Sequence, residues 1–238
     1  MPLKTIARFW RADWYLSFLL GLLLLVVFVL YPLSGRGPFG GVLFQLFFSL
    51  ILISGAALVA NSRAALVLAL LLAAGTAAIG WIRLYAPSSR LTILDTSLWI
   101  AFFSMLAAVI LVQVFREGKI NFHRIQGAVC VYLLLGVIWA GCYHLVIQFD
   151  PSAFNLAHPA DDNTVMSRLV YFSFVTLTTL GYGDVTAVNP AAQSLALLEA
   201  LAGQLFPAVL IARLVAMEVI HHQEKLDRDH KLRVKDAE

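Results

Sequence analysis

Long runs of apolar residues, separated by short stretches rich in polar residues, glycine and proline, dominate this sequence. A helix needs about 20 apolar residues to cross a bilayer, and six runs reach that length. They cover residues 14–33, 39–60, 64–85, 91–115, 123–149 and 190–217. The pattern predicts an all-α membrane protein with six transmembrane helices.

The composition agrees with this prediction. Of the 238 residues, 61% are apolar and 13% are charged, whereas a soluble domain is about half apolar and about a quarter charged. The first run follows a basic start and is longer than the apolar core of a signal peptide, so we expect a membrane helix there. No catalytic triad, phosphate-binding loop, zinc spacing or cofactor loop stands out. We therefore expect neither an enzyme nor a nucleic-acid partner.

The placement of lysine and arginine predicts the orientation. If both termini are cytoplasmic, most of the 17 Lys and Arg residues fall on the cytoplasmic side, as in most membrane proteins. We expect a multi-pass protein of the cell's inner or plasma membrane, in contact with lipids. The interval 150–189 then starts on the outer face and dips back into the membrane.

That interval contains the stretch VTLTTLGYGDVT, residues 175–186. Irregular backbone at membrane depth is tolerated only where protein buries it or where it lines a water-filled cavity. One reason for such a loop is an ion path, in which backbone carbonyl groups replace the water shell of a cation. Successive carbonyls point to one side only if the dihedral angles alternate unusually, and glycine allows this at low steric cost. The loop therefore predicts an ion path.

The residues TTLGYGD closely resemble the selectivity filter of potassium channels. The resemblance implies a filter over residues 179–183, in which dehydrated K⁺ is coordinated by the Thr179 hydroxyl and by four carbonyls. Those carbonyls belong to Thr179, Leu180, Gly181 and Tyr182, and Gly183 completes the filter. Leu180 stands where valine or isoleucine is commoner. Four such strands imply a four-fold homotetramer, and no cofactor is expected besides K⁺.

The flanking residues extend the resemblance. Residues 164–178 can form a re-entrant pore helix whose C-terminal end favours a cation, with Thr178 on its last turn. Tyr171 and Phe172 stand where the family often carries a tryptophan pair. Val175 stands where some members carry a glutamate that pairs with the aspartate after the filter. We expect filter stability and inactivation to differ from those relatives.

Asp184 matches that aspartate, just outside the filter. Glu199 is an ionisable residue within the last membrane segment, and such residues are functional candidates. One interpretation places it behind the filter, bonded to the pore helix and protonated. The other interpretation is contact with the permeating ion.

The last apolar run, 190–217, resembles the inner helix of these channels. Gly203 lies at the offset where the family commonly has a glycine bend, and Pro207 removes a helical hydrogen bond. The pair predicts either a gating hinge or a static kink. Gly203, Pro207, Ile211 and Val215 share one helical face, with Gln204 beside it. An apolar ring at Ile211 or Val215 could gate by dewetting; Gln204 contacts either the hydrated ion or a neighbouring helix.

Six spans with a pore loop before the last one is the layout of voltage-gated cation channels. A voltage sensor needs several buried arginines, yet the fourth run, 91–115, contains no Lys or Arg. We expect weak or no voltage dependence. Arg83 and Asp95 are expected to pair near the outer boundary, as a surface pair of small energetic value.

The predicted organisation has four parts. They are a four-helix membrane domain resembling an uncharged voltage sensor (1–115), a linker (116–122), a pore domain (123–218) and a charged cytoplasmic tail (219–238). The basic segment 116–124 either binds anionic lipid headgroups or is a solvated connection.

These predictions favour a potassium-selective channel that conducts passively. The first alternative is an accessory or sensor membrane protein that conducts little by itself. The second alternative is a non-selective cation channel, against which the intact Gly-Tyr-Gly sequence argues.

Overall fold

The computed structural model of the chain describes residues 16–30, 38–59, 63–86, 88–115, 122–156 and 162–235. The first helix covers Leu16–Leu30 and ends in a π-helical turn, η1 (Val26–Leu30). The later helices are α3 (Pro38–Leu58), α4 (Arg63–Tyr85), α5 (Ser89–Phe115), α6 (Phe122–Phe149), α7 (Asp162–Leu177) and α8 (Pro190–Lys235). The fold is almost entirely helical, as predicted.

Four helices of the described residues are long and apolar enough to cross a membrane. They span Arg63–Arg83, Ser89–Phe115, Phe122–Phe149 and Pro190–Val219. The first two predicted runs give shorter apolar helices within the described residues, Leu16–Leu30 and Gln45–Leu58. Six crossings therefore stay a prediction.

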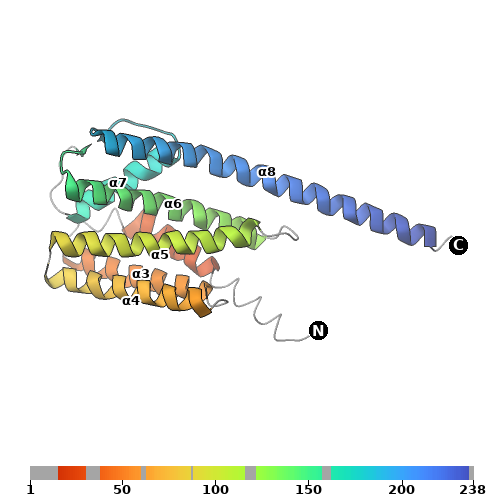
Figure 1. The fold of residues 1–238 in the computed structure, drawn as a ribbon, viewed down its shortest axis with the longest axis horizontal. Helices are drawn as coiled ribbons and strands as arrows, with labels where there is room; N and C mark the ends of the chain where they lie inside the picture. The colour runs from red at the N-terminus through yellow and green to blue at the C-terminus, as the bar shows by residue number, and fades with distance from the viewer. Residues whose placement is uncertain are drawn as a thin grey trace.

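The helices before α6 form a bundle with it, in which α5 and the first helix contact α6 of the same chain. In Figure 1, α4, α3, α5 and α6 lie roughly parallel, and α5 packs along α6. The first helix reaches α6 as well, where the Ser17 hydroxyl donates to Gln126 Oε1 at 3.2 Å. One apolar core runs from Leu19 through Phe102 to Leu134. Consecutive helices joined by a short connection are usually neighbours, and only residues 116–121 separate α5 from α6.

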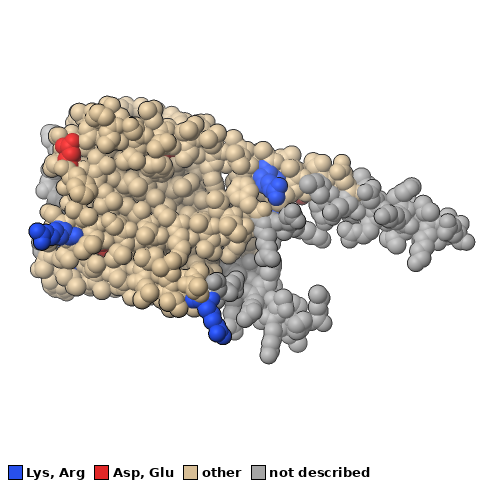
Figure 2. Space-filling view, in the orientation of Figure 1, with Lys and Arg blue, Asp and Glu red and all other residues tan. Residues whose placement is uncertain are grey.

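The surface of this helical body is poor in charge. On the face shown in Figure 2, few charged side chains are seen; most lie near the ends of the helices, and one basic side chain lies partway along α8. Many exposed residues are large and apolar, among them Leu71, Val112 and Leu197. An apolar surface of this kind is suited to lipid or to another subunit.

Two short strands, which the sequence analysis did not predict, flank α7. β1 (Phe154–Asn155) pairs antiparallel with β2 (Thr186–Ala187), and Phe154 lies opposite Ala187. This pairing returns the chain to the end of α6 after α7 and the loop that follows. Strands of two residues leave no detectable alternation of apolar and polar residues, so they could not be seen in the sequence.

The boundaries of α7 and α8 differ from the predicted ones. α7 covers 162–177 instead of 164–178, and α8 runs to Lys235 instead of ending at 217. Asn189 caps α8, because its Oδ1 accepts the Ala192 N–H at 2.7 Å. Pro190 takes the first helical position, which suits its fixed φ. The predicted tail thus continues α8 well beyond the other helices (Figure 1).

Candidate functional site

The stretch of residues 178–185, called here the GYG loop, alternates in backbone conformation. Thr179, Gly181 and Gly183 have φ angles of 60°, 56° and 80°, and they are the described residues with positive φ. For a non-glycine residue such as Thr179 this region is uncommon and costs about 1–3 kcal/mol. Unusual dihedral angles that alternate in this way are what successive carbonyl groups need in order to point to a common side.

The amide groups of the GYG loop bond back to the last turn of α7. The Val175 carbonyl accepts the N–H of Leu180 at 2.9 Å and that of Gly181 at 3.4 Å. The Thr179 N–H donates to the Thr176 carbonyl at 2.9 Å. Within the described residues, no backbone N–H donates to the carbonyls of residues 179 to 182. The N–H groups of the loop therefore donate to carbonyls of α7, while the carbonyls of residues 179 to 182 stay available as acceptors.

Every residue from Thr178 to Asp184 is exposed in the single chain. Leu180 and Tyr182 are 58% and 67% exposed, which is high for large side chains at the membrane depth predicted for them. The loop is therefore incompletely covered by its own chain.

The C-terminal end of α7 is held from two sides. The Phe174 carbonyl accepts both the N–H and the hydroxyl of Thr178, at 3.0 and 2.6 Å. From α6, the Tyr132 hydroxyl donates to the Leu177 carbonyl at 3.2 Å. From α8, Gly203 packs so closely that a methyl group there would overlap the same carbonyl. Gly203 thus serves a close approach of two backbones.

Gln204 reaches the GYG loop itself. Its Nε2 donates to Thr179 Oγ1 at 2.9 Å, so α8 contacts the residue that has the unusual φ angle. Further along α8, Pro207 is half-buried inside the helix, while Ile211 and Val215 are 61% and 57% exposed. The predicted inner face of α8 therefore begins at the loop and continues away from it.

Tyr171 and Phe172, which the sequence analysis grouped together, point to different partners. Tyr171 hydrogen-bonds the Asp184 carboxylate, so the aspartate has a partner although Val175 cannot serve as one. Phe172 is buried, with its ring centroid 5.1 Å from that of Tyr143 and 5.5 Å from that of Phe154. One residue thus supports the loop, and the other anchors α7 in an aromatic core.

Glu199 joins three helices at a fully buried position behind the GYG loop. The Tyr143 hydroxyl of α6 lies 2.5 Å from Glu199 Oε2. The Ser173 hydroxyl of α7 lies 2.5 Å from Glu199 Oε1 and 2.6 Å from the Gly136 carbonyl of α6. Of the two interpretations of Glu199, the hydrogen bond to the helix before the loop is the one found in the structure. Sequence reasoning missed Tyr143 and Ser173, whose signal was polarity within apolar runs.

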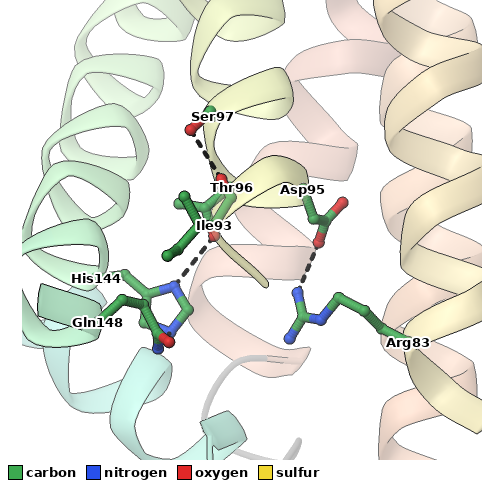
Figure 3. A network of polar contacts seen from close by, with 7 residues as sticks. All are labelled: Arg83, Ile93, Asp95, Thr96, Ser97, His144 and Gln148. Atoms are coloured by element: carbon green, nitrogen blue, oxygen red, sulfur yellow. Dashed lines mark hydrogen bonds and ion pairs between the residues drawn. The ribbon is translucent and has the colours of Figure 1, made fainter. Parts of the chain in front are cut away.

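A second polar network links α4, α5 and α6 (Figure 3). Arg83 and Asp95 form the predicted ion pair, with Nη1 and Oδ2 2.7 Å apart, but Asp95 is buried instead of lying at the surface. Beside it, Thr96 Oγ1 lies 3.2 Å from Nδ1 of the buried His144, whose Nε2 is 3.4 Å from Gln148 Nε2. This network fastens the helices before α6 to the helix that also contacts Glu199.

Most of the basic segment predicted to meet lipid, residues 116–121, lies outside the described residues. Arg124, at its end, places Nη1 3.5 Å from Met217 Sδ on α8. No group of three His, Cys, Asp or Glu side chains that could hold a metal ion is found in the described part of the chain.

Comparison with known proteins points to ion channels. Residues 127–219 match the model of a family described as "Ion channel". Protein LctB of Bacillus caldotenax is 29% identical over 127 residues, which cover 48% of this chain and 93% of that protein. No solved structure matches the chain significantly. The family match includes α6, α7, the GYG loop and the apolar part of α8, and it supports an ion channel, a transport protein, in place of an enzyme.

Proposed function

We propose that this protein is a potassium-selective channel that conducts K⁺ passively through a homotetrameric pore. One observation carries the proposal: in TTLGYGD, positive φ angles alternate at Thr179, Gly181 and Gly183, within the region that matches the ion channel family. A chance surface turn has no need of this alternation. An ion path needs it, because carbonyl groups must replace the water shell of the cation.

The coordinating groups follow from the free acceptors of the loop. K⁺ is held by the carbonyls of residues 179 to 182 and, at the inner end, by the Thr179 hydroxyl. The Thr179 oxygen has two lone pairs. One accepts the Gln204 amide, and the other is available to an ion.

The tetramer is proposed because one chain supplies one strand of the pore. In an apolar stretch of 18 residues within α8, only 11% of the residues are buried. Its exposed large side chains include Leu197, Leu198, Leu201, Leu205 and Val209. A closed symmetric ring would cover part of this surface and would bring four GYG loops together, and lipid would cover the rest.

The helices before α6 are proposed to form a domain with little voltage sensitivity. After Arg90 in its first turn, α5 carries no Lys or Arg. Moving one elementary charge through 100 mV is worth about 2.3 kcal/mol, so a helix without buried charges couples weakly to the field. We place both termini in the cytoplasm, because the lysine and arginine distribution favours that orientation.

The test is K⁺ and Na⁺ flux into proteoliposomes that contain the purified protein, Gly181→Ala or Tyr182→Ala. The control is Gly21→Ala, since Gly21 has no neighbouring atom within 4 Å of an added methyl group. We expect K⁺-selective flux in the wild type and the control, and its loss in both loop variants. Equal K⁺ and Na⁺ flux that resists both substitutions would move the ion path elsewhere. Absence of flux under all conditions would favour an accessory protein.

A further inference from the structure

If Glu199 were ionised, the cluster formed by Glu199, Tyr143, Ser173 and the Gly136 carbonyl would hold too few protons for its hydrogen-bond acceptors. Ser173 has a single hydroxyl proton, yet its oxygen lies within hydrogen-bond distance of two acceptors, the Gly136 carbonyl at 2.6 Å and Glu199 Oε1 at 2.5 Å. If Ser173 donates to Gly136, an ionised carboxylate would face the lone pairs of the serine. A protonated Glu199 removes this conflict, because it donates to Ser173 Oγ while its other oxygen accepts from Tyr143.

Among the described residues, no ion pair joins Glu199 to a positively charged side chain. Glu199 is 0% exposed, and a buried carboxylate without a cationic partner is costly. The titratable groups that interact with Glu199 all belong to α6, and none of them can carry a positive charge. They are Tyr132, Cys142 and Tyr143. From α7 the described contact is the Ser173 hydroxyl.

We propose that Glu199 is a protonated positioning residue whose carboxyl proton completes a hydrogen-bonded chain from Tyr143 through Ser173 to the backbone of α6. This chain fastens α7 to both α6 and α8 one helical turn before Leu177, where α7 ends. Loss of the proton would put a carboxylate opposite the Ser173 oxygen and loosen that turn. Its consequence for conduction rests on the proposed channel function, whereas the protonation itself does not.

Infrared spectroscopy of the purified protein tests the protonation directly. The spectrum of the wild type minus that of Glu199→Gln should contain the carbonyl stretch of a protonated carboxylic acid at neutral pH. The control is Glu218→Gln, an exposed position on the same helix, whose difference spectrum should contain carboxylate bands. Carboxylate bands for Glu199 would overturn the proposal, whether or not the protein conducts.

Ion flux and thermal unfolding test the positioning role. Glutamine can donate to Ser173 and accept from Tyr143 as the protonated acid does, so Glu199→Gln should retain K⁺ flux and unfolding temperature close to the wild type. Glu199→Ala leaves the Tyr143 hydroxyl without its partner, and we expect flux or selectivity to fall about tenfold. Ser173→Ala should give a loss in the same direction.

The pH profile separates a proton-linked role from plain packing. As alkaline pH removes the carboxylic acid band of the wild type, its K⁺ flux should fall over the same interval, while Glu199→Gln should show no such fall. Equal loss of flux in Glu199→Gln and Glu199→Ala, or a band that disappears while flux is unchanged, would overturn the positioning role. If the wild type does not conduct at all, the unfolding temperatures of the same variants decide the question.

Discussion

Helices α6 and α8 are both long and apolar enough to cross a membrane, yet the chain covers them very differently. Within an apolar stretch of 18 residues in α6, 56% of the residues are buried, against 11% in the corresponding stretch of α8. α6 packs between α5 and α7 and contacts the first helix, so helices of the same chain cover most of its apolar surface. In the described part of the chain, α8 contacts α7, α6 and the short strand β2. The apolar pattern alone cannot distinguish these cases, because lipid and protein interior both favour apolar side chains.

The contacts that α8 does make are concentrated near the GYG loop. Glu199, Gly203 and Gln204 meet Ser173, the Leu177 carbonyl and Thr179, respectively. These contacts lie within six consecutive residues of α8, and their partners run from the last turns of α7 into the loop. Beyond Pro207, the side-chain hydrogen bond found between the described part of α8 and another helix is the one from Arg124 to Met217. We infer that the anchored part of α8 positions the loop. In the proposed tetramer, the remainder of α8 would be free to contact other subunits.

The largest expected effect contrasts a buried leucine of α6 with an exposed one of α8. Leu134 is 0% exposed and Leu201 is 56% exposed. Leu134→Ala should lower the free energy of unfolding by about 2–5 kcal/mol through the cavity it leaves. Leu201→Ala should change the stability of the single chain little and act on assembly. Denaturant unfolding and the mass of the detergent-solubilised assembly separate the two. Equal destabilisation of the single chain by both would mean that α8 is not an uncovered helix.

Glycines of the two helices give the second contrast. An added methyl group at Gly203 meets the backbone of Leu177, whereas one at Gly136 meets the far end of the Phe174 ring. A ring can rotate away and a backbone cannot, so Gly203→Ala should cost about 1–3 kcal/mol and Gly136→Ala less. Gly21→Ala serves as the control without steric conflict. Thermal unfolding in detergent measures all three, and a harmless Gly203→Ala would remove the close approach of α8 to α7.

The third contrast concerns the amide at the inner end of the loop. Gln204→Leu removes the hydrogen bond to Thr179, while Gln223→Leu makes the same change at an exposed position on the same helix. A hydrogen bond of this kind is worth about 0.5–1.5 kcal/mol. We expect the K⁺ to Na⁺ flux ratio to change by roughly three- to tenfold in the first variant. Identical ratios in both variants would deny Gln204 a role at the loop.

The smallest effect concerns Asp150, which links the end of α6 to the start of α8. Hydrogen bonds from Ser152 and Asn189 lower the pKa of Asp150 below 3.8. A lowered pKa means that the ionised form is stabilised in the folded state. This contribution is present above about pH 4 and is lost as the pH falls through the folded pKa. Asp150→Asn should therefore lower the unfolding temperature slightly at pH 7, and the difference from the wild type should shrink as the pH falls through the folded pKa. A difference independent of pH would point to lost geometry instead of lost charge.

Much of the architecture near the GYG loop could be anticipated from local sequence. The apolar runs predict α4, α5, α6 and the apolar part of α8, and a short helix before the loop was expected within two residues of its actual start. The pairing of Arg83 with Asp95 and the bond of Glu199 to α7 were also anticipated. Each of these rests on periodicity, on charge in an apolar run, or on a glycine requirement, all of which are local signals.

The partners of those residues could not be anticipated in the same way. Tyr132, Tyr143 and Ser173 resemble ordinary polar positions in apolar helices until α6, α7 and α8 come together. The two-residue strands and the separate directions of Tyr171 and Phe172 likewise depend on segments distant in the chain.

The sequence by itself determined that the chain is a helical membrane protein with an irregular glycine-containing loop, because lipid demands apolar runs and left-handed backbone demands glycine. Only the tertiary structure decided which helix is enclosed, which is left open, and where the acid behind the loop finds its hydrogen-bond partners. Apolar residues favour lipid and protein alike, so their pattern predicts the helix and leaves the choice of neighbour to packing.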